Sequence, residues 1–122
     1  MRALIVDDSR FVRKHIRALL ESEGIECNEA DNGLAAMECL RSGPPFDLAL
    51  VDWNMPVMNG IDMLRTLRVE GFSELKVMMV TTEGESDRIQ LALQAGADEF
   101  LMKPFDGEAL LEKLALLGLE AA

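Results

Sequence analysis

The most constraining feature of this 122-residue sequence is a regular alternation of short apolar runs with longer segments of helical apolar spacing. Five apolar runs have the length and composition of buried strands: residues 3–6, 25–30, 47–51, 76–80 and 98–102. Five helical patterns follow them, at residues 9–23, 34–41, 61–69 and 86–95 and from about residue 106 onward. Strict strand–helix alternation is typical of a parallel sheet covered by helices. The sequence therefore predicts a single α/β domain over residues 1–122.

Polar residues and glycines mark the ends of the predicted helices. Ser9 is placed to cap the first helix, and Gly24 follows its end, where glycine tolerates the turn that stops a helix. The apolar residues of this helix are predicted to share one inward face: Phe11, Val12, Ile16, Leu19 and Leu20. The fourth strand is predicted to stop at Val80, so that Thr81 and Thr82 begin a polar loop.

Composition narrows the classes of partner and the compartment. The chain is 49% hydrophobic but only 5% aromatic, so we expect an aliphatic core. A formal net charge of -10 argues against nucleic acid and against an anionic membrane surface as direct partners. Cys27 and Cys39 do not form a CxxC pair, and we expect reduced thiols. The N-terminal apolar run is too short for a signal peptide or a membrane span, so we expect a cytoplasmic protein.

Charged residues follow three of the predicted strands. Asp7 and Asp8 come after the first strand, Asp52 after the third and Lys103 after the fifth. Because the carboxyl ends of parallel strands meet at the ligand-binding edge of such sheets, we expect these side chains to converge. Clustered carboxylates repel one another unless a cation lies among them, which predicts a hard metal ion and an anion that meets the lysine. Taken singly, each residue also has an ordinary alternative as a helix cap, a turn residue or a surface charge.

Four motifs at strand ends resemble those of bacterial response-regulator receiver domains. They are Val6-Asp7-Asp8-Ser9, Val51-Asp52-Trp53-Asn54-Met55-Pro56, Val80-Thr81-Thr82-Glu83 and Lys103-Pro104-Phe105. Taken together and in this order, they cover essentially the whole chain, which is most similar to single-domain chemotaxis regulators of the CheY kind. The resemblance implies a flavodoxin-like sheet of five parallel strands in the order 2-1-3-4-5, with five helices on both faces.

The resemblance also implies a phosphoacceptor site. Asp52 is expected to accept a phosphoryl group, whose oxygens would be met by Lys103 and Thr81. The implied Mg²⁺ ligands are Asp8, Asp52, the backbone carbonyl of Asn54 and, through water, Asp7. The protein would promote its own phosphorylation and dephosphorylation without being an enzyme with an external product. The fluorescence of Trp53, beside this site, is expected to report binding of Mg²⁺ or phosphate mimics.

The same resemblance assigns a conformational switch to Thr81 and Phe100. Movement of the threonine toward the phosphate would let the aromatic ring turn inward and change the surface of the fourth and fifth helices. Phe100 stands where close relatives often carry tyrosine, so the tyrosine hydroxyl is absent here. Three residues near the site are expected to tune phosphate hydrolysis: Asn54, Thr82 and Glu83. The Lys103–Pro104 peptide bond is expected to be cis.

The implied partners are proteins: a sensor histidine kinase or phosphotransfer protein as the donor, and an output partner such as the flagellar motor switch. We expect a monomer that binds neither nucleic acid nor membrane. Four basic residues on the first helix form either a solvated face or a docking surface for an acidic donor: Arg10, Arg13, Lys14 and Arg17.

Three alternatives remain open. The first is that the chain is a receiver excised from a larger regulator, the second that it is a phosphate shuttle or sink, and the third that it is a small aspartyl-phosphate phosphohydrolase. The last is disfavoured because such enzymes place a second aspartate where this chain has Asn54, and because the sequence holds no cap domain.

Overall fold

The computed structural model describes residues 1–82 and 86–119. Strands and helices alternate along the chain as predicted: β1 (Arg2–Val6), α1 (Arg10–Glu21), β2 (Glu26–Ala30), α2 (Gly33–Ser42), β3 (Leu48–Asp52), α3 (Gly60–Val69), β4 (Lys76–Thr82), α4 (Ser86–Ala95), β5 (Glu99–Lys103) and α5 (Gly107–Leu116). None of the described helices combines the length and the apolar character needed to cross a lipid bilayer.

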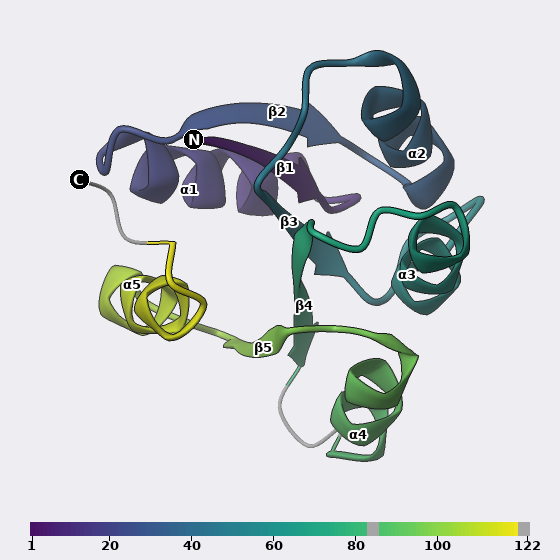
Figure 1. The fold of residues 1–122 in the computed structure, drawn as a ribbon. Helices are drawn as coiled ribbons and strands as arrows, with labels where there is room; N and C mark the ends of the chain where they lie inside the picture. Colours follow the sequence, from purple (N-terminus) through teal and green to yellow (C-terminus); the bar gives the residue numbers. More distant parts are fainter. Residues whose placement is uncertain (83–85, 120–122) are drawn as a thin grey trace.

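All neighbouring strands are parallel, in the order β2-β1-β3-β4-β5. The flavodoxin-like order implied by the sequence motifs is therefore confirmed. Figure 1 shows α1 and α5 on one face of the sheet and α2, α3 and α4 on the other. The strands are buried on both faces, which explains why they appear in the sequence as almost continuous apolar runs.

Side-chain alternation along β1 divides the core into two halves. Leu4 and Val6 pack with residues of α2 and α3, whereas Ala3 and Ile5 pack with residues of α1 and α5. All four side chains are at most 1% exposed. Burial of these aliphatic groups from water is the main force holding the helices to the sheet.

The predicted start of the first helix is confirmed, because the Ser9 hydroxyl accepts a hydrogen bond from the backbone N–H of Val12. The prediction for the inward face of this helix is partly wrong. Ile16 and Leu20 are buried, but Phe11 is 82% exposed. At 100° per residue, Phe11 lies roughly 140° around the helix from Ile16 and so points away from the sheet.

The polar loop predicted after Val80 is also wrong in its first two residues. Thr81 and Thr82 belong to β4, where they pair with Met102 and Lys103 of β5. The backbone hydrogen bonds of the neighbouring strand extend β4 beyond its apolar run. This extension puts Thr81 and Lys103 on adjacent strands at the carboxyl edge of the sheet.

Both cysteines are free thiols, as expected, with Cys27 buried in β2 and Cys39 half-buried in α2. Burial raises the pKa of Cys27 to about 11, and the charge of Glu21 adds to this shift. A thiol with so high a pKa is unreactive at neutral pH.

Candidate functional site

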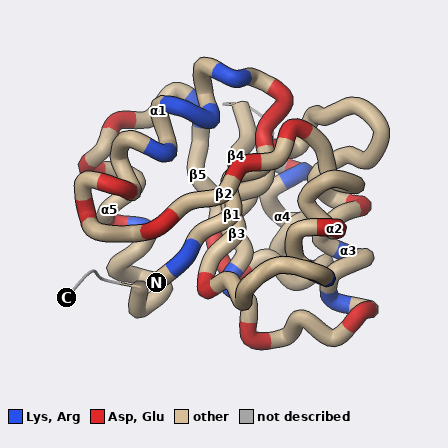
Figure 2. Tube along the Cα trace, turned by 90° about the horizontal axis from the view of Figure 1, so that it is seen from above, with Lys and Arg blue, Asp and Glu red and all other residues tan. Residues whose placement is uncertain are grey.

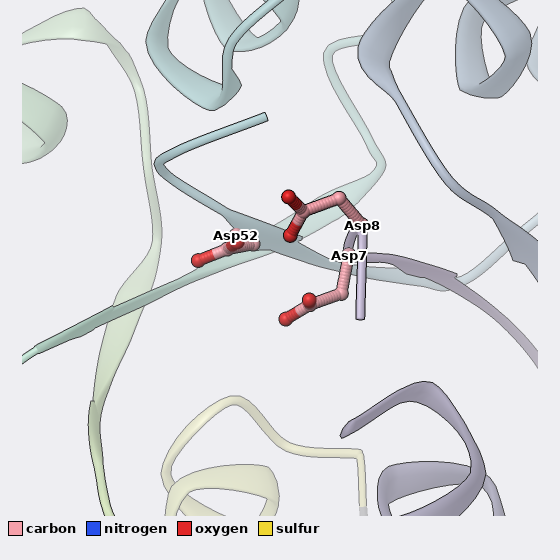
Figure 3. Close-up of side chains that lie close together, drawn as sticks. All are labelled: Asp7, Asp8 and Asp52. Atoms are coloured by element: carbon pink, nitrogen blue, oxygen red, sulfur yellow. The ribbon is translucent and has the colours of Figure 1, made fainter. Parts of the chain in front are cut away.

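Three carboxylates meet at the carboxyl edge of the sheet. Asp7 and Asp8 follow β1 and Asp52 is the last residue of β3, and each offers an oxygen within 4.8 Å of the others. Figure 3 shows the three side chains gathered in one place. Asp7 and Asp52 are buried, at 2% and 7% exposure, whereas Asp8 is exposed. The convergence predicted from the sequence is confirmed.

Strand register and a close backbone contact explain the position of Asp52. Val6 pairs with Val51 across β1 and β3, which brings the residues after each to the same level. The chain then folds back, and the Gly60 N–H donates to the Trp53 carbonyl at 2.9 Å. A Cβ at position 60 would lie 2.3 Å from the Asp52 carbonyl oxygen. Glycine is therefore required there for the return of the chain past the phosphoacceptor candidate.

Lys103 reaches this cluster from the end of β5. Its Nζ lies 3.0 Å from Asp7 Oδ2 and 3.3 Å from Asp52 Oδ1. Burial acts to lower the pKa of Lys103, but the hydrogen bond to Asp7 and the charges of both aspartates outweigh it and raise this pKa. The side chain is therefore an ammonium group over the whole neutral range. The Lys103–Pro104 bond is cis, as expected.

The Asp52 carboxylate is held in an unfavourable electrostatic position. Its pKa is raised, first by burial and then by the charge of Asp7, and Lys103 offsets these effects only in part. Carboxylates that crowd one another in this way, with one of the three open to solvent, suit a hard divalent cation with oxygen ligands. The donor set at this site thus fits Mg²⁺.

Asp7 is fixed in orientation on both sides of its carboxyl group. The Ser9 N–H donates to Oδ1 at 2.9 Å, and Lys103 donates to Oδ2. In addition, Arg13 Nη1 donates to the backbone carbonyl of Asp7 at 2.7 Å. A carboxylate held so firmly can orient a neighbouring group without being displaced.

The remaining residues predicted at the site take different positions around it. Thr81 is buried at 3% exposure, directly after the β4 residue that pairs with Asp52. Thr82 is exposed and lines a groove of about 470 Å³ together with Lys103 and Phe105. Asn54 is exposed, and its Oδ1 accepts a hydrogen bond from Arg88. The predicted contribution of Glu83 lies outside the described residues.

Phe100, the predicted switch aromatic, is half-buried in β5. The ammonium group of Lys113 lies over its ring, 4.4 Å from the centroid, and also binds Glu99 Oε1 at 3.1 Å. The ring therefore lies between β5 and α5 under a cation. This contact is part of the surface that the resemblance assigns to signal output.

Three of the four basic residues predicted as a face of the first helix bind one carboxylate. Arg13, Lys14 and Arg17 donate to Glu29 of β2 at 3.1, 2.8 and 2.6 Å. Figure 2 shows the basic positions along α1 in this otherwise acidic chain. Burial acts to raise the pKa of Glu29, but hydrogen bonds from the three cations lower it to about 2. The basic residues of α1 are thus more than a solvated face, because three of them form ion pairs with Glu29.

Sequence reasoning missed two residues in this region, Glu29 and Arg88. Both act through contacts between elements far apart in the chain, with Glu29 clamped to α1 and Arg88 touching Trp53 and Asn54. Neither belongs to a motif. The excess of basic residues on one helix was the only signal that pointed to a carboxylate partner for them.

Comparison with known proteins agrees with this geometry. Residues 3–115 match the family model of the response regulator receiver domain. The chain is 45% identical over 116 residues to the chemotaxis protein CheY of Pseudomonas aeruginosa, with 93% of each chain covered. It is 42% identical to the chemotaxis protein CheY-3 of Vibrio cholerae, with 93% of this chain and 88% of the relative covered.

Solved structures give the same result. The chemotaxis protein CheY4 of Vibrio cholerae superposes with a TM-score of 0.88 at 32% identity, covering 94% of this chain and 96% of that one. The receiver domain of the Francisella response regulator 1452 superposes with a TM-score of 0.86 at 26% identity, covering 95% and 94%. From the matched residues, the shared fold and the strand-end motifs, this chain belongs to the response regulator receiver domain family.

Proposed function

We propose that this protein is the phosphoacceptor switch of a two-component system, with a role in chemotaxis. The observation that carries the proposal is the convergence of buried Asp52 with Asp7, Asp8 and Lys103 at the edge of the sheet. A carboxylate held beside other acidic groups and an ammonium group suits the transfer of a phosphoryl group. Similarity to chemotaxis proteins of two bacteria supports the pathway.

The proposed reaction transfers a phosphoryl group from a phosphohistidine to Asp52. An Asp52 carboxylate oxygen forms a bond to phosphorus while the phosphorus–nitrogen bond breaks, and the electron pair of that bond returns to the imidazole nitrogen. Mg²⁺, when bound by Asp8, Asp52 and the Asn54 carbonyl, supplies positive charge that offsets the charge on the phosphoryl oxygens. Burial and Asp7 raise the pKa of Asp52, whereas Lys103, and Mg²⁺ when bound, favour the ionised carboxylate that attacks phosphorus.

The neighbouring side chains have separate roles in this proposal. Lys103 leaves Asp52 to meet a phosphoryl oxygen and keeps its contact with Asp7. Asp7, whose carboxyl group is fixed in orientation, would orient a water molecule of the bound Mg²⁺. The Thr81 hydroxyl turns to the phosphate, and Phe100 then leaves the cation of Lys113 to turn inward.

The proposed partners are a histidine kinase or phosphotransfer protein as the donor and a protein such as the flagellar motor switch as the output. The protein is proposed to work in the cytoplasm as a monomer, with residues 1–122 forming the receiver domain. Its chemistry is limited to its own phosphorylation and dephosphorylation. Steady turnover of a small phosphate ester would instead favour the phosphohydrolase.

The direct test is incubation with acetyl phosphate and Mg²⁺ followed by measurement of the intact mass. One phosphate adduct is expected on the wild-type protein and none on Asp52→Asn. Asp31→Asn is a matched control, because Asp31 follows β2 as Asp52 ends β3, and it should keep the adduct. Absence of any adduct on the folded wild-type protein contradicts the proposal.

Lys103→Ala separates phosphorylation from signalling. This variant is expected to retain an adduct, since Asp52 and the acidic metal ligands are unchanged. It should lose binding to the output partner, because no cation on β5 contacts the phosphoryl group. The measurement is binding of the output partner with and without acetyl phosphate. Normal phosphate-dependent binding by Lys103→Ala would exclude this role for the lysine.

A further inference from the structure

Arg88, in the first turn of α4, makes two contacts with the residues that directly follow Asp52. Its Nη1 lies 3.3 Å from the Asn54 Oδ1, and its guanidinium carbon lies 5.2 Å from the centroid of the Trp53 ring. α4 lies beside α3 and packs on β4, on the same face of the sheet (Figure 1). Arg88 is therefore a direct link between a helix of the expected output surface and the phosphoacceptor loop.

The two partners of Arg88 differ in how firmly they are held. Trp53 is only 8% exposed. Its backbone N–H donates to the Val80 carbonyl at 3.2 Å, and its backbone carbonyl accepts a hydrogen bond from the Gly60 N–H. Its ring is thus a fixed platform for a cation. Asn54, by contrast, is exposed, so the hydrogen bond from Arg88 orients its amide.

We infer that Arg88 is a positioning residue that sets the lifetime of the phosphoryl group on Asp52 by holding the Asn54 amide against the Trp53 ring. The inference rests on the proposed phosphorylation of Asp52. Loss of the phosphoryl group requires a water oxygen to attack phosphorus. The bond from phosphorus to the Asp52 oxygen breaks and its electron pair stays on the carboxylate. Inorganic phosphate leaves with the water oxygen, and the protons of the water remain on the phosphate or pass to solvent.

The Asn54 amide is placed to affect this step. An amide oxygen beside the phosphorus can accept a hydrogen bond from the attacking water and so orient it. In this structure that oxygen accepts from Arg88, which occupies one of its two lone pairs and fixes where the oxygen points, so the contact competes with such a role. The hydrogen bond from Arg88 therefore preserves the phosphorylated state.

The test follows the decay of the phosphate adduct after removal of acetyl phosphate. Arg88→Ala is expected to shorten the adduct half-life by about 3- to 10-fold, the size of effect that a single hydrogen bond of ordinary strength supports. Arg88→Lys keeps the charge but not the planar guanidinium group, so the half-life of its adduct should fall between those of wild type and Arg88→Ala. Gln90→Ala, an exposed position on the same helix, should stay within about twofold of wild type.

A double variant tests whether the effect passes through Asn54. If it does, adding Arg88→Ala to Asn54→Ala should shorten the half-life far less than Arg88→Ala does alone. Equal shortening in both backgrounds overturns the inference. A half-life of Arg88→Ala within about twofold of wild type, or a longer one, also overturns it.

A second readout needs no phosphate. Trp53 is the single tryptophan of the chain, so emission at its wavelengths reports the contact with Arg88 directly. Arg88→Ala should change the emission intensity of the metal-free protein, Arg88→Lys should restore part of it, and Gln90→Ala should leave it unchanged. Unchanged emission in Arg88→Ala overturns the contact. Failure of wild type to take up phosphate instead contradicts the proposed function, whatever the emission shows.

Discussion

At the scale of single residues, Val57 is the clearest departure from local preference. It adopts a φ of 68° in the loop between β3 and α3, where its side chain is 77% exposed. A β-branched side chain in this left-handed region crowds its own backbone and costs about 1–3 kcal/mol. The next residue, Met58, donates its N–H to the Pro56 carbonyl at 2.7 Å, so the tight turn holds Val57 in this conformation. The strain lies in the segment that leads from Asp52 to Gly60.

Replacing Val57 by glycine should therefore stabilise the protein. Glycine removes the steric cost but adds entropy to the unfolded chain, which leaves a net gain of about 1 kcal/mol in the free energy of unfolding. Urea unfolding measures this gain. Val69→Gly is the matched control, because Val69 is also exposed, at 87%, but lies in helix α3. That change should destabilise by about 0.3–0.5 kcal/mol, the difference in helix propensity between valine and glycine. A loss of stability in both variants would show that Val57 is not strained.

At the scale of elements, α1 is clamped to the sheet by charge as well as by its apolar face. Arg13, Lys14 and Arg17 converge on Glu29 of β2, and Arg17 also donates to the Cys27 carbonyl at 3.1 Å. Only 12% of the Glu29 side chain is exposed. Ion pairs shielded in this way are worth more than pairs in open water, and losing the one shared carboxylate leaves three cations together.

Glu29→Gln should lower the free energy of unfolding at pH 7 by about 2 kcal/mol, since the amide cannot satisfy three cations. The pKa of Glu29 is about 2 in the folded protein, below its ordinary value of 4.5. Its stabilising effect is therefore complete above pH 4.5 and is lost as the pH falls toward 2. Urea unfolding at pH 7 and pH 3 should show the difference between wild type and variant shrinking with acid.

Glu26→Gln on the same strand provides the comparison for the Glu29 variant. Glu26 pairs with Arg2 at 2.6 Å, but its side chain is 70% exposed, so its removal should change stability by less than about 0.5 kcal/mol. Equal effects of the two substitutions would contradict the clamp.

At the scale of the whole molecule, the fold concentrates negative charge at one edge of a chain that already carries a net charge of -10. Hydrophobic burial on both faces of the sheet outweighs the repulsion among Asp7, Asp8 and Asp52. Lys103 relieves the repulsion only in part, as the raised pKa of Asp52 indicates. A cation that binds the folded protein should therefore stabilise it strongly.

Mg²⁺ at about 100 times its Kd should raise the free energy of unfolding by about 2.7 kcal/mol and the Tm by roughly 10 °C. Removal by a chelator should reverse the shift. Asp8→Asn should lose most of it, because the exposed Asp8 is a predicted ligand, whereas Asp31→Asn should retain it. Thermal melts of the three proteins with Mg²⁺ and with chelator provide the measurement. An equal shift in wild type and Asp8→Asn would place the cation elsewhere.

The sequence was sufficient to predict the fold and the convergence of the main residues of the candidate site. Apolar runs of strand length alternating with helical patterns allow few architectures, and Ser9 caps the first helix through a contact only three residues away. Asp7, Asp8, Asp52 and Lys103 were predictable together because parallel strands carry their carboxyl ends to one edge, whatever the details of packing.

Tertiary structure decided the features that depend on one element meeting another. Phe11 is exposed because only part of α1 faces the sheet, and β4 continues through Thr82 because β5 pairs with it. Arg88 contacts Asn54 across 34 positions of the chain. Glu29 binds three cations that lie 12 to 16 positions before it. Local spacing determines which residues form strands, helices and caps. Contacts between distant residues depend on how those elements pack, and no pattern in the sequence records that.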